Sequence, residues 1–337
     1  MDSVQQGCKI VVSVWPGLGD VVFATPVFEA LRSKKPDAKI TALVWSKGGR
    51  ELLKNNPFID DIVEGSIFHF VAKFKNYDIG IQCSQPVQPL FMLAGIKQRI
   101  SFNGNPFWWL YPVDSNNLHS YEYYLKTVTK IDGIAPKEKP ECNVFLSELD
   151  EKFGREELKN VTKPIIAIHP GARCNKNKRW GTDKFVELAK VLISKYNAKI
   201  VFIGGKEDII LSNYIKQQLS DYSDKIIDFT GKISILQSAA IIKNCNLFIG
   251  NASGPTHIAA AIGAPVVAIY GADNPVNFSP PGKKVRVVTP NNKCAPCFHF
   301  YRNFFWGMRL RYIPTCRALK SIKVETVLNT CKEILEN

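Results

Sequence analysis

Short runs of Val and Ile alternate with stretches of helical periodicity along most of this chain, and this alternation constrains the fold most strongly. Residues 8–14 predict a strand that stops at a Pro-Gly turn, and apolar residues recur at helical spacing over residues 21–31. Further strands are predicted at residues 39–44 and 77–81. Strands that alternate with helices in this way form βαβ units and a mainly parallel sheet.

The alternation stops and then restarts. Between about residues 136 and 164 the sequence is charged and lacks long apolar runs, which predicts a linker. Beyond it, strands separated by helical stretches are predicted at residues 165–168, 199–203, 247–249 and 266–270. We therefore predict two doubly wound α/β domains, as a length of 337 residues also favours. Such sheets bind ligands beyond the carboxyl ends of their strands, so the expected site is the cleft between the domains.

The charge balance narrows the set of partners. With 44 Lys and Arg against 30 Asp and Glu, the formal net charge is +14, which attracts phosphorylated substrates, anionic lipid or nucleic acid. A solvated Lys-rich surface would give the same total. No apolar run reaches the ~18–20 residues of a transmembrane helix, and the first eight residues lack the features of an export signal. We therefore expect a cytoplasmic protein with reduced cysteines.

The first candidate motif is Gly-Leu-Gly-Asp at residues 17–20, directly after the first predicted strand. Glycines at such a point let backbone N–H groups approach a ligand, and the helix that follows favours anions. The third glycine of a dinucleotide fingerprint is missing. Asp20 is therefore either an ordinary helix N-cap or a general base at the mouth of a cleft.

The second motif is His-Pro-Gly-Ala at residues 169–172, after another predicted strand. A basic loop follows and contains Lys176, Lys178 and Arg179, with Trp180 at its end. Cations in a loop over the carboxyl end of a strand suit a diphosphate. The alternative is a solvated run of charges, which the bulky Trp180 makes less attractive.

The third motif runs from Gly250 to His257. Ser253 is a candidate N-cap, and Pro255 stands at a favoured first-turn position. A helix that begins over a cleft offers its N–H groups to phosphate. His257 would either hydrogen-bond a phosphate or sugar or be a satisfied core histidine.

Together these stretches resemble glycosyltransferase family 9, the ADP-heptose:lipopolysaccharide heptosyltransferase family. The matching segments occur in the family's order across residues 10–275: GLGDVVFATPVFEALRSKKPDAKI, IHPGARCNKNKRW and NASGPTHIAAAIGAPVVAIYGADNP. The resemblance implies an α/β GT-B fold with two Rossmann-like domains that face a cleft. It implies an acceptor-binding domain at residues 1–155, a nucleotide-sugar-binding domain at residues 156–320, and a terminal helix at residues 321–337 that returns to the N-terminal domain. It also implies an inverting sugar transfer that needs no metal for the chemistry.

The resemblance also implies roles for individual residues. Asp20 matches the catalytic base, which takes the proton from the acceptor hydroxyl as this attacks the anomeric carbon. Lys178 matches the cation on the donor diphosphate. Of the pair Glu207-Asp208, Glu207 is preferred as the carboxylate on the nucleotide ribose. The other residues assigned to the nucleotide-sugar donor are Gly19, Arg179, Ser253, Gly254 and His257.

One position departs from the family pattern. The family commonly has Asp before the Ser-Gly of the third motif, where this chain has Ala252. The usual carboxylate helps to hold the donor sugar. The resemblance therefore leaves the sugar open between heptose and a related one.

Four cysteines near the C-terminus are candidate metal ligands: Cys294, Cys297, Cys316 and Cys331. A C-x-x-C pair with two further thiols is typical of a structural Zn or Fe site. The alternative is that the thiols are buried, since Cys331 stands in the amphipathic stretch VETVLNTCKEIL. Some protein heptosyltransferases that resemble the family use cysteine-bound iron.

Residues 298–312, between these cysteines, interleave Arg302, Arg309 and Arg311 with aromatic side chains. This pattern fits buried packing, single-strand nucleic-acid stacking or a membrane-interface patch. For an enzyme with a lipid-linked acceptor, the membrane interpretation fits best.

These features predict an inverting glycosyltransferase that moves a heptose, or a related sugar, from an ADP-sugar to a lipopolysaccharide core or similar anionic glycan. We expect it to be cytoplasmic, in transient contact with the inner face of the cytoplasmic membrane, without a nucleic-acid partner. One alternative is a relative that glycosylates a protein or another surface polysaccharide. Another is a non-catalytic nucleotide-sugar-binding protein, which would have no use for a carboxylate at Asp20.

Overall fold

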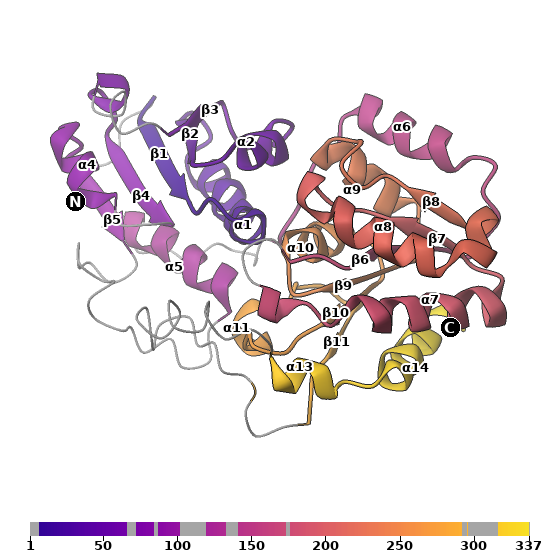
Figure 1. Cartoon of the computed structure of the whole chain (residues 1–337). Coiled ribbons are helices and arrows are strands. Elements are labelled where there is room, and N and C mark those ends of the chain that lie inside the picture. The colour runs from indigo at the N-terminus through magenta and orange to yellow at the C-terminus, as the bar shows by residue number, and fades with distance from the viewer. Residues whose placement is uncertain are drawn as a thin grey trace. The chain divides into compact units, whose positions relative to one another are not determined.

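A computed structural model of the chain describes residues 7–65, 72–83, 87–101, 119–132, 141–172, 176–291, 295 and 316–336 (Figure 1). The chain divides into two compact units, Met1–Phe145 and Leu146–Asn337. Each unit is built on one parallel sheet, as the alternating pattern predicts.

The sheet of the first unit has the strand order β3-β2-β1-β4-β5, and each described pairing is parallel. Its strands are β1 (Lys9–Val14), β2 (Lys39–Val44), β3 (Asp61–Glu64), β4 (Ile79–Cys83) and β5 (Gln98–Ser101). The chain runs from β1 outward to β3 and then returns to add β4 and β5 on the other side of β1. The switch point of this sheet therefore lies between β1 and β4.

Helices of the first unit are α1 (Leu18–Lys34), α2 (Lys47–Leu53), α4 (Gln88–Leu93) and α5 (Ser120–Asp132). Helix α1 packs on α5 and buries Val21–Leu31 except Glu29. Helix α4 approaches the sheet closely, because a Cβ on Gly80 of β4 would lie 2.8 Å from the ring of Phe91.

The second unit has the strand order β11-β10-β9-β6-β7-β8, again with parallel pairings. Its strands are β6 (Ile165–His169), β7 (Lys199–Phe202), β8 (Ile226–Asp228), β9 (Leu247–Asn251), β10 (Val266–Ile269) and β11 (Val285–Val288). Its helices are α6 (Glu148–Leu158), α7 (Thr182–Tyr196), α8 (Ile209–Gln218), α9 (Ile235–Lys243), α10 (Gly254–Ala261), α11 (Pro275–Phe278), α13 (Arg317–Ser321) and α14 (Val324–Leu335).

Successive strand residues of this sheet point to opposite faces, and both faces are covered by helices. Ile166 and Ile168 of β6 pack with side chains of α7, α8 and α14 on one face. Ile165 and Ala167 pack with side chains of α6, α9 and α10 on the other. The predicted strands at residues 165–168, 199–203, 247–249 and 266–270 are thus confirmed.

Helix α6 occupies part of the segment expected to be a linker. Ser147 begins it with a capping box, in which the Asp150 N–H donates to the Ser147 hydroxyl and the Asp150 side chain accepts from the Ser147 N–H. The helix packs against α9 so closely that a Cβ on Gly154 would lie 2.5 Å from the carbonyl oxygen of Ala240. The boundary between the units therefore precedes α6, at residues 145–146 rather than 155–156.

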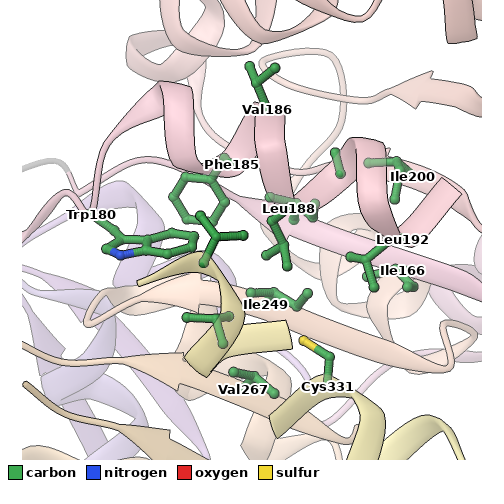
Figure 2. Packing of buried hydrophobic residues seen from close by; sticks show 14 of the residues in the cluster. Ile166, Trp180, Phe185, Val186, Leu188, Leu192, Ile200, Ile249, Val267 and Cys331 are labelled. Carbon is green, nitrogen blue, oxygen red and sulfur yellow. The ribbon is translucent and has the colours of Figure 1, made fainter. Parts of the chain in front are cut away.

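Helix α14 belongs to the second unit, whereas the resemblance places the terminal helix on the first. It packs on α7, β9, β10 and β11, and its buried stripe is Val324, Val327 and Cys331. Figure 2 shows Cys331 facing the apolar cluster that contains Val267 and Ile249. These contacts bury the one apolar face of the helix, which explains its position.

A hydrogen bond from a tryptophan holds the segment before α14. The indole Nε1 of Trp180 donates to the carbonyl of Ile322 over 3.0 Å. Lys184 on α7 donates to the carbonyls of Lys320 and Ile322, at 2.6 and 2.7 Å. The end of the predicted basic loop is therefore joined to the C-terminal segment.

Candidate functional site

The switch point of the second sheet lies between β6 and β9. From β6 the chain adds β7 and β8 on one side, then returns to add β9, β10 and β11 on the other. Loops that leave two such strands in opposite directions open a crevice at their carboxyl ends, where α/β proteins bind ligands. His169 and Asn251 end these two strands, so the second and third sequence motifs meet here.

Three residues that are far apart in the sequence form a largely buried hydrogen-bonded row, which we call the Asp208–His169–Ser253 row. His169 Nδ1 lies 3.1 Å from Ser253 Oγ, and His169 Nε2 lies 3.2 Å from Asp208 Oδ2. His169 is 3% exposed and Asp208 4%. The row therefore ties the end of β6 to the turn after β7 and to the start of α10.

Two glycines make room for the carboxyl group of Asp208. A Cβ on Gly171 would overlap Oδ1 of Asp208 and lie 2.9 Å from Nε2 of His169. A Cβ on Gly204 would lie 2.9 Å from Oδ2 of Asp208. The glycine of the His-Pro-Gly motif is thus required by the close approach of a carboxylate rather than by a turn.

Asp208, rather than Glu207, is the carboxylate built into this row. It also accepts a hydrogen bond from the N–H of Gly205, over 3.1 Å. Burial opposes its ionisation, but the hydrogen bond and charge of His169, the Gly205 N–H and the charge of Arg179 hold the pKa of Asp208 below its ordinary value. Glu207 is exposed on the 3₁₀ turn Lys206–Asp208.

The role of Asp208 was missed in the sequence, although one signal was available. It is the third residue after Gly205, the position from which an acidic side chain reaches back to the N–H that precedes a helical turn.

Asn251 is fully buried and holds the two motif loops together. Its amide nitrogen donates to the carbonyls of Pro170 and Gly171, at 2.8 and 3.2 Å. Its amide oxygen accepts from the backbone N–H of Trp180 over 3.0 Å. Asn251 therefore fixes both ends of the loop that carries the basic residues, a role that its neighbours in sequence do not suggest.

Ala252, the position that departs from the family pattern, is 7% exposed and packs in the apolar cluster that covers one face of the sheet. Its N–H donates to the carbonyl of Ile269 over 3.1 Å. The methyl side chain thus serves as packing between β9 and α10.

Both predicted cations of the basic loop lie beside acidic groups. Lys178 Nζ lies 2.8 Å from Asp273 Oδ2, and Asp273 follows β10. Arg179 acts on Asp208, and its Nε atom is buried without a hydrogen-bond partner among the residues that the structure describes. The other oxygen of Asp273 has none there either. The side chains of residues 173–176 lie outside the described part.

Helix α10 begins at Gly254, and Ser253 is its N-cap residue in extended backbone. Contrary to expectation, the Ser253 hydroxyl does not cap the helix; it reaches His169 instead. The N–H groups of Thr256 and His257 donate to the Ser253 carbonyl at 3.1 and 3.4 Å, so an anion at this end would meet the Gly254 N–H and the positive end of the helix dipole. His257, in the first turn, is 7% exposed.

The corresponding switch point of the first sheet carries Asp20. Gly17 precedes α1 and Asp20 stands in its first turn, together with Gly19. Tyr124 on α5 is buried next to Asp20: burial, and then the charge of Asp20, raise the pKa of Tyr124 well above its ordinary value. A Cβ on Gly17 would lie 2.6 Å from Oδ2 of Asp20.

Two of the four candidate metal ligands can be assessed. Cys331 is fully buried among apolar side chains, and burial raises the pKa of its thiol to about 12. Metal ligation needs the thiolate, which this environment disfavours. The Sγ of Cys316 accepts the N–H of Leu319 over 3.4 Å at the start of α13. In the free protein Cys331 is thus packed as a buried thiol among apolar side chains, and Cys294 and Cys297 lie outside the described residues.

Two further findings concern the described ranges alone. No cluster of three or more His, Cys, Asp or Glu side chains there is arranged to hold a metal ion. None of the helices described has the length and apolar character needed to cross a membrane. The arginine and aromatic segment at residues 298–312 falls outside these ranges.

Comparison with known proteins agrees with this arrangement. The model of glycosyltransferase family 9 (heptosyltransferase) matches residues 75–304. Lipooligosaccharide heptosyltransferase 2 of Haemophilus ducreyi is 25% identical over 83% of this chain and 88% of its own length. The protein of the same name from Campylobacter jejuni is 23% identical over 98% of this chain and 99% of its own.

A solved structure has the same fold. The ADP-heptose lipopolysaccharide heptosyltransferase II of Escherichia coli superimposes with a TM-score of 0.79 at 23% identity. The match covers 97% of this chain and 98% of that protein. The two α/β units are therefore those of the GT-B fold.

Proposed function

Because this chain belongs to glycosyltransferase family 9, and is therefore a glycosyltransferase, we propose that it moves a heptose, or a related sugar, from an ADP-sugar to a lipopolysaccharide core or similar anionic glycan. The heptosyltransferases of H. ducreyi and C. jejuni, similar over 83% and 98% of the chain, support this substrate class. On this proposal the second unit binds the donor and the first unit binds the acceptor.

The observation that carries the proposal is the set of anion-binding groups at the carboxyl edge of the second sheet. Helix α10 begins there without a side-chain cap from Ser253. Lys178 and Arg179 stand in the loop that Asn251 anchors to the same edge. A helix N-terminus with two cations is suited to a diphosphate, which leaves with two negative charges when the sugar is transferred.

Asp20 supplies the opposite chemistry. In the proposed reaction, its carboxylate takes the proton from the acceptor hydroxyl. The hydroxyl oxygen forms a bond to the anomeric carbon while the bond from that carbon to the diphosphate breaks. Tyr124 stays protonated beside it, since burial and the charge of Asp20 both raise its pKa.

The donor residues have unequal support. Ser253, Gly254 and Lys178 lie at the edge just described. Glu207 is exposed on the turn after β7, and its assignment to the ribose rests on the family resemblance alone. Ala252 has no carboxylate with which to hold the donor sugar, so the sugar stays open between a heptose and a related one.

The proposal is tested with a thermal-shift screen of ADP, UDP and GDP, followed by transfer assays. A ligand that binds only the folded protein stabilises it by ~2.7 kcal/mol at a hundredfold excess over Kd. We expect ADP to raise the Tm most, and ADP-heptose to label a heptose-deficient lipopolysaccharide. A larger shift with UDP or GDP would refute the ADP donor.

We also propose that the enzyme works at the cytoplasmic face of the inner membrane and docks there reversibly through residues 298–312. The net charge of +14 supports this. Each of three arginines near anionic lipid contributes ~1 kcal/mol. Co-sedimentation with anionic vesicles should therefore fall when Arg302, Arg309 and Arg311 are all changed to Gln. Equal partitioning of the two proteins would rule out this segment as the docking surface.

A further inference from the structure

Asp273 is a buried carboxylate that uses only one of its oxygens among the residues that the structure describes. It follows β10, and its Oδ2 atom lies 2.8 Å from Nζ of Lys178. Its Oδ1 atom has no hydrogen-bond partner in the described part of the chain. A carboxylate only accepts hydrogen bonds, and a buried acceptor without a donor is costly. Oδ1 of Asp273 is therefore a place for a donor that the described residues do not supply.

Polar side chains next to Asp273 in the sequence have other partners. The hydroxyl of Tyr270 donates to the carbonyl of Phe278 over 2.6 Å. The amide nitrogen of Asn274 donates to Oδ1 of Asn277 over 2.8 Å. Asp273 is nevertheless close to the phenol, because burial, and then the charge of Asp273, raise the pKa of Tyr270 well above its ordinary value.

The charges at this edge favour different parts of a nucleotide-sugar at different groups. The diphosphate is anionic, so Lys178 and Arg179 attract it. The carboxylate of Asp273 repels phosphate. A sugar is uncharged and carries hydroxyl groups, each of which can donate a hydrogen bond. Oδ1 of Asp273 therefore suits a sugar hydroxyl and does not suit a phosphate.

The strand order indicates the direction in which a nucleotide-sugar extends. In the sheet β11-β10-β9-β6-β7-β8, the switch-point strands β9 and β6 have β10 on one side and β7 on the other. In doubly wound nucleotide-binding units the ribose lies beyond the strand that follows the first one, which is β7 here. The sugar is attached to the opposite end of the diphosphate from the ribose. With the diphosphate at the switch point, the sugar lies on the side of β10, which Asp273 follows.

We propose that Asp273 accepts a hydrogen bond from a hydroxyl of the transferred sugar and thereby helps to select that sugar. This inference rests on the proposed function, because it takes the ligand of the second unit to be an ADP-sugar. Lys178 then connects the two parts of the donor, since it attracts the diphosphate and is paired with the carboxylate that binds the sugar. Ala252, directly after β9, has only a methyl side chain and cannot accept this hydrogen bond.

Binding of ADP and of ADP-sugars separates recognition of the sugar from recognition of the diphosphate. Isothermal titration calorimetry of the full chain gives the Kd of ADP, ADP-heptose, ADP-mannose and ADP-glucose, and the ADP-sugar that wild type binds most tightly is kept. The readout is the Kd of ADP divided by the Kd of that ADP-sugar, since contacts with the nucleotide affect both. For Asp273→Ala we expect this ratio to fall about tenfold, the effect of losing a hydrogen bond to a charged group.

A role of Asp273 that is confined to holding Lys178 predicts a different result. The variant Asp273→Ala would then lose affinity for ADP and for the ADP-sugar by the same factor. The ratio would stay at its wild-type value, and the proposal would be overturned.

Two further variants control for folding and for the loss of an ion pair. Asp273→Asn keeps the size of the side chain, and its neutral amide makes a weaker hydrogen bond, so the ratio should fall about threefold. An unchanged ratio in this variant would contradict the proposal even if Asp273→Ala does not fold. Asp228→Ala removes another carboxylate paired with a lysine, Lys216, at the end of β8. It should leave the ratio unchanged; a fall as large as in Asp273→Ala would refute a specific role of Asp273.

Failure of the proposed function gives results that differ from these. If wild type does not bind ADP, the ADP donor is refuted, and this inference is refuted with it. If wild type binds ADP but none of the ADP-sugars, the nucleotide site stands and a sugar contact of Asp273 is refuted. If both kinds of ligand bind and the ratio is the same in wild type and Asp273→Ala, only the role of Asp273 is refuted.

Discussion

The first five strands of each sheet follow the same order, and the second sheet adds β11 at its edge, but the residues at the two switch points differ in charge. In the first unit, β1 leads through a short glycine turn directly into α1, and a carboxylate stands in its first turn beside a neutral tyrosine. In the second unit, β6 is followed by residues 170–181, a longer loop that carries cations and is anchored by Asn251.

This difference follows from what each loop must do. A single carboxylate needs only a rigid helix start, which the turn at Gly17 supplies. A diphosphate has several oxygens, so its site must bring together donors from several strand ends. The longer loop and the buried row meet that need. The fold thus fixes where chemistry occurs, and loop length decides which kind occurs there.

The sharpest test of this comparison is Asp20→Asn, which keeps the size of the side chain but cannot accept the proton. We expect the kcat of transfer to fall by at least ~10²-fold, while calorimetry shows ADP affinity unchanged, because the donor groups lie in the other unit. Glu29→Gln, on the same helix but farther along, is the matched control and should retain activity. Near-normal turnover by Asp20→Asn would refute the assignment of Asp20 as the catalytic base.

Lys178→Ala should affect both kinetic constants. The lysine attracts the diphosphate in the ground state and more strongly as negative charge develops, so we expect KM to rise and kcat to fall, with a combined loss of ~10- to 100-fold. Steady-state kinetics with the ADP-sugar measure this loss. Lys190→Ala removes an exposed lysine of α7 and serves as control. Equal kinetics of the two variants would make the basic loop an ordinary solvated surface.

Alanine substitutions of Gly171 and Gly17 should lower the stability of the protein by different amounts. Gly171→Ala drives a methyl group into the buried Asp208 carboxyl, which should lower the free energy of unfolding by ~1–3 kcal/mol. Gly17→Ala places a methyl group against the Asp20 side chain in the first helical turn, where that side chain can move. We therefore expect a smaller loss of stability than for Gly171→Ala, together with a loss of transfer activity because Asp20 is displaced. Thermal melts measure both. A double variant, Gly171→Ala with Asp208→Ala, should recover part of the loss; strict additivity would show that the two residues do not compete for space.

The smallest effect is expected for Cys331→Ala. Removal of a buried sulfur should lower stability by ~1 kcal/mol, with transfer activity and metal content unchanged. Elemental analysis of wild type and variant provides the check. Loss of bound Zn or Fe in the variant would return Cys331 to the set of metal ligands.

The sequence pattern predicted the central strands of both sheets and missed the four edge strands β3, β5, β8 and β11. Central strands are buried on both faces and appear as apolar runs, as in KIVVSV of β1. An edge strand is partly exposed and short; β8 consists of Ile226, Ile227 and Asp228, all half-buried. Such a segment has no distinctive pattern, and only pairing with a neighbour makes it a strand.

The motif loops were identifiable because glycines and cations mark them, but their partners were not. His169 and Asp208 are 39 residues apart, and His169 and Ser253 are 84 apart. Local spacing cannot predict a hydrogen bond across such distances. Asn251 and Asp273 both lie within the third matching segment, yet the sequence predicts no role for either. Their partners, Trp180 and Lys178, are also distant in the sequence.

Because α14 lies at the end of the chain, the second unit cannot complete its packing until the last residues have been synthesised. Residues of the first unit have all been made once the ribosome passes Phe145. In the second unit β10 ends at Ile269, and the residues of α14 that cover β9 and β10, namely Val324, Val327 and Cys331, are made roughly 60 residues later. At ~5–20 residues per second this delay amounts to roughly 3–12 s. During that interval one apolar face of the second sheet remains partly open, so a newly made chain needs protection there, and the first unit does not.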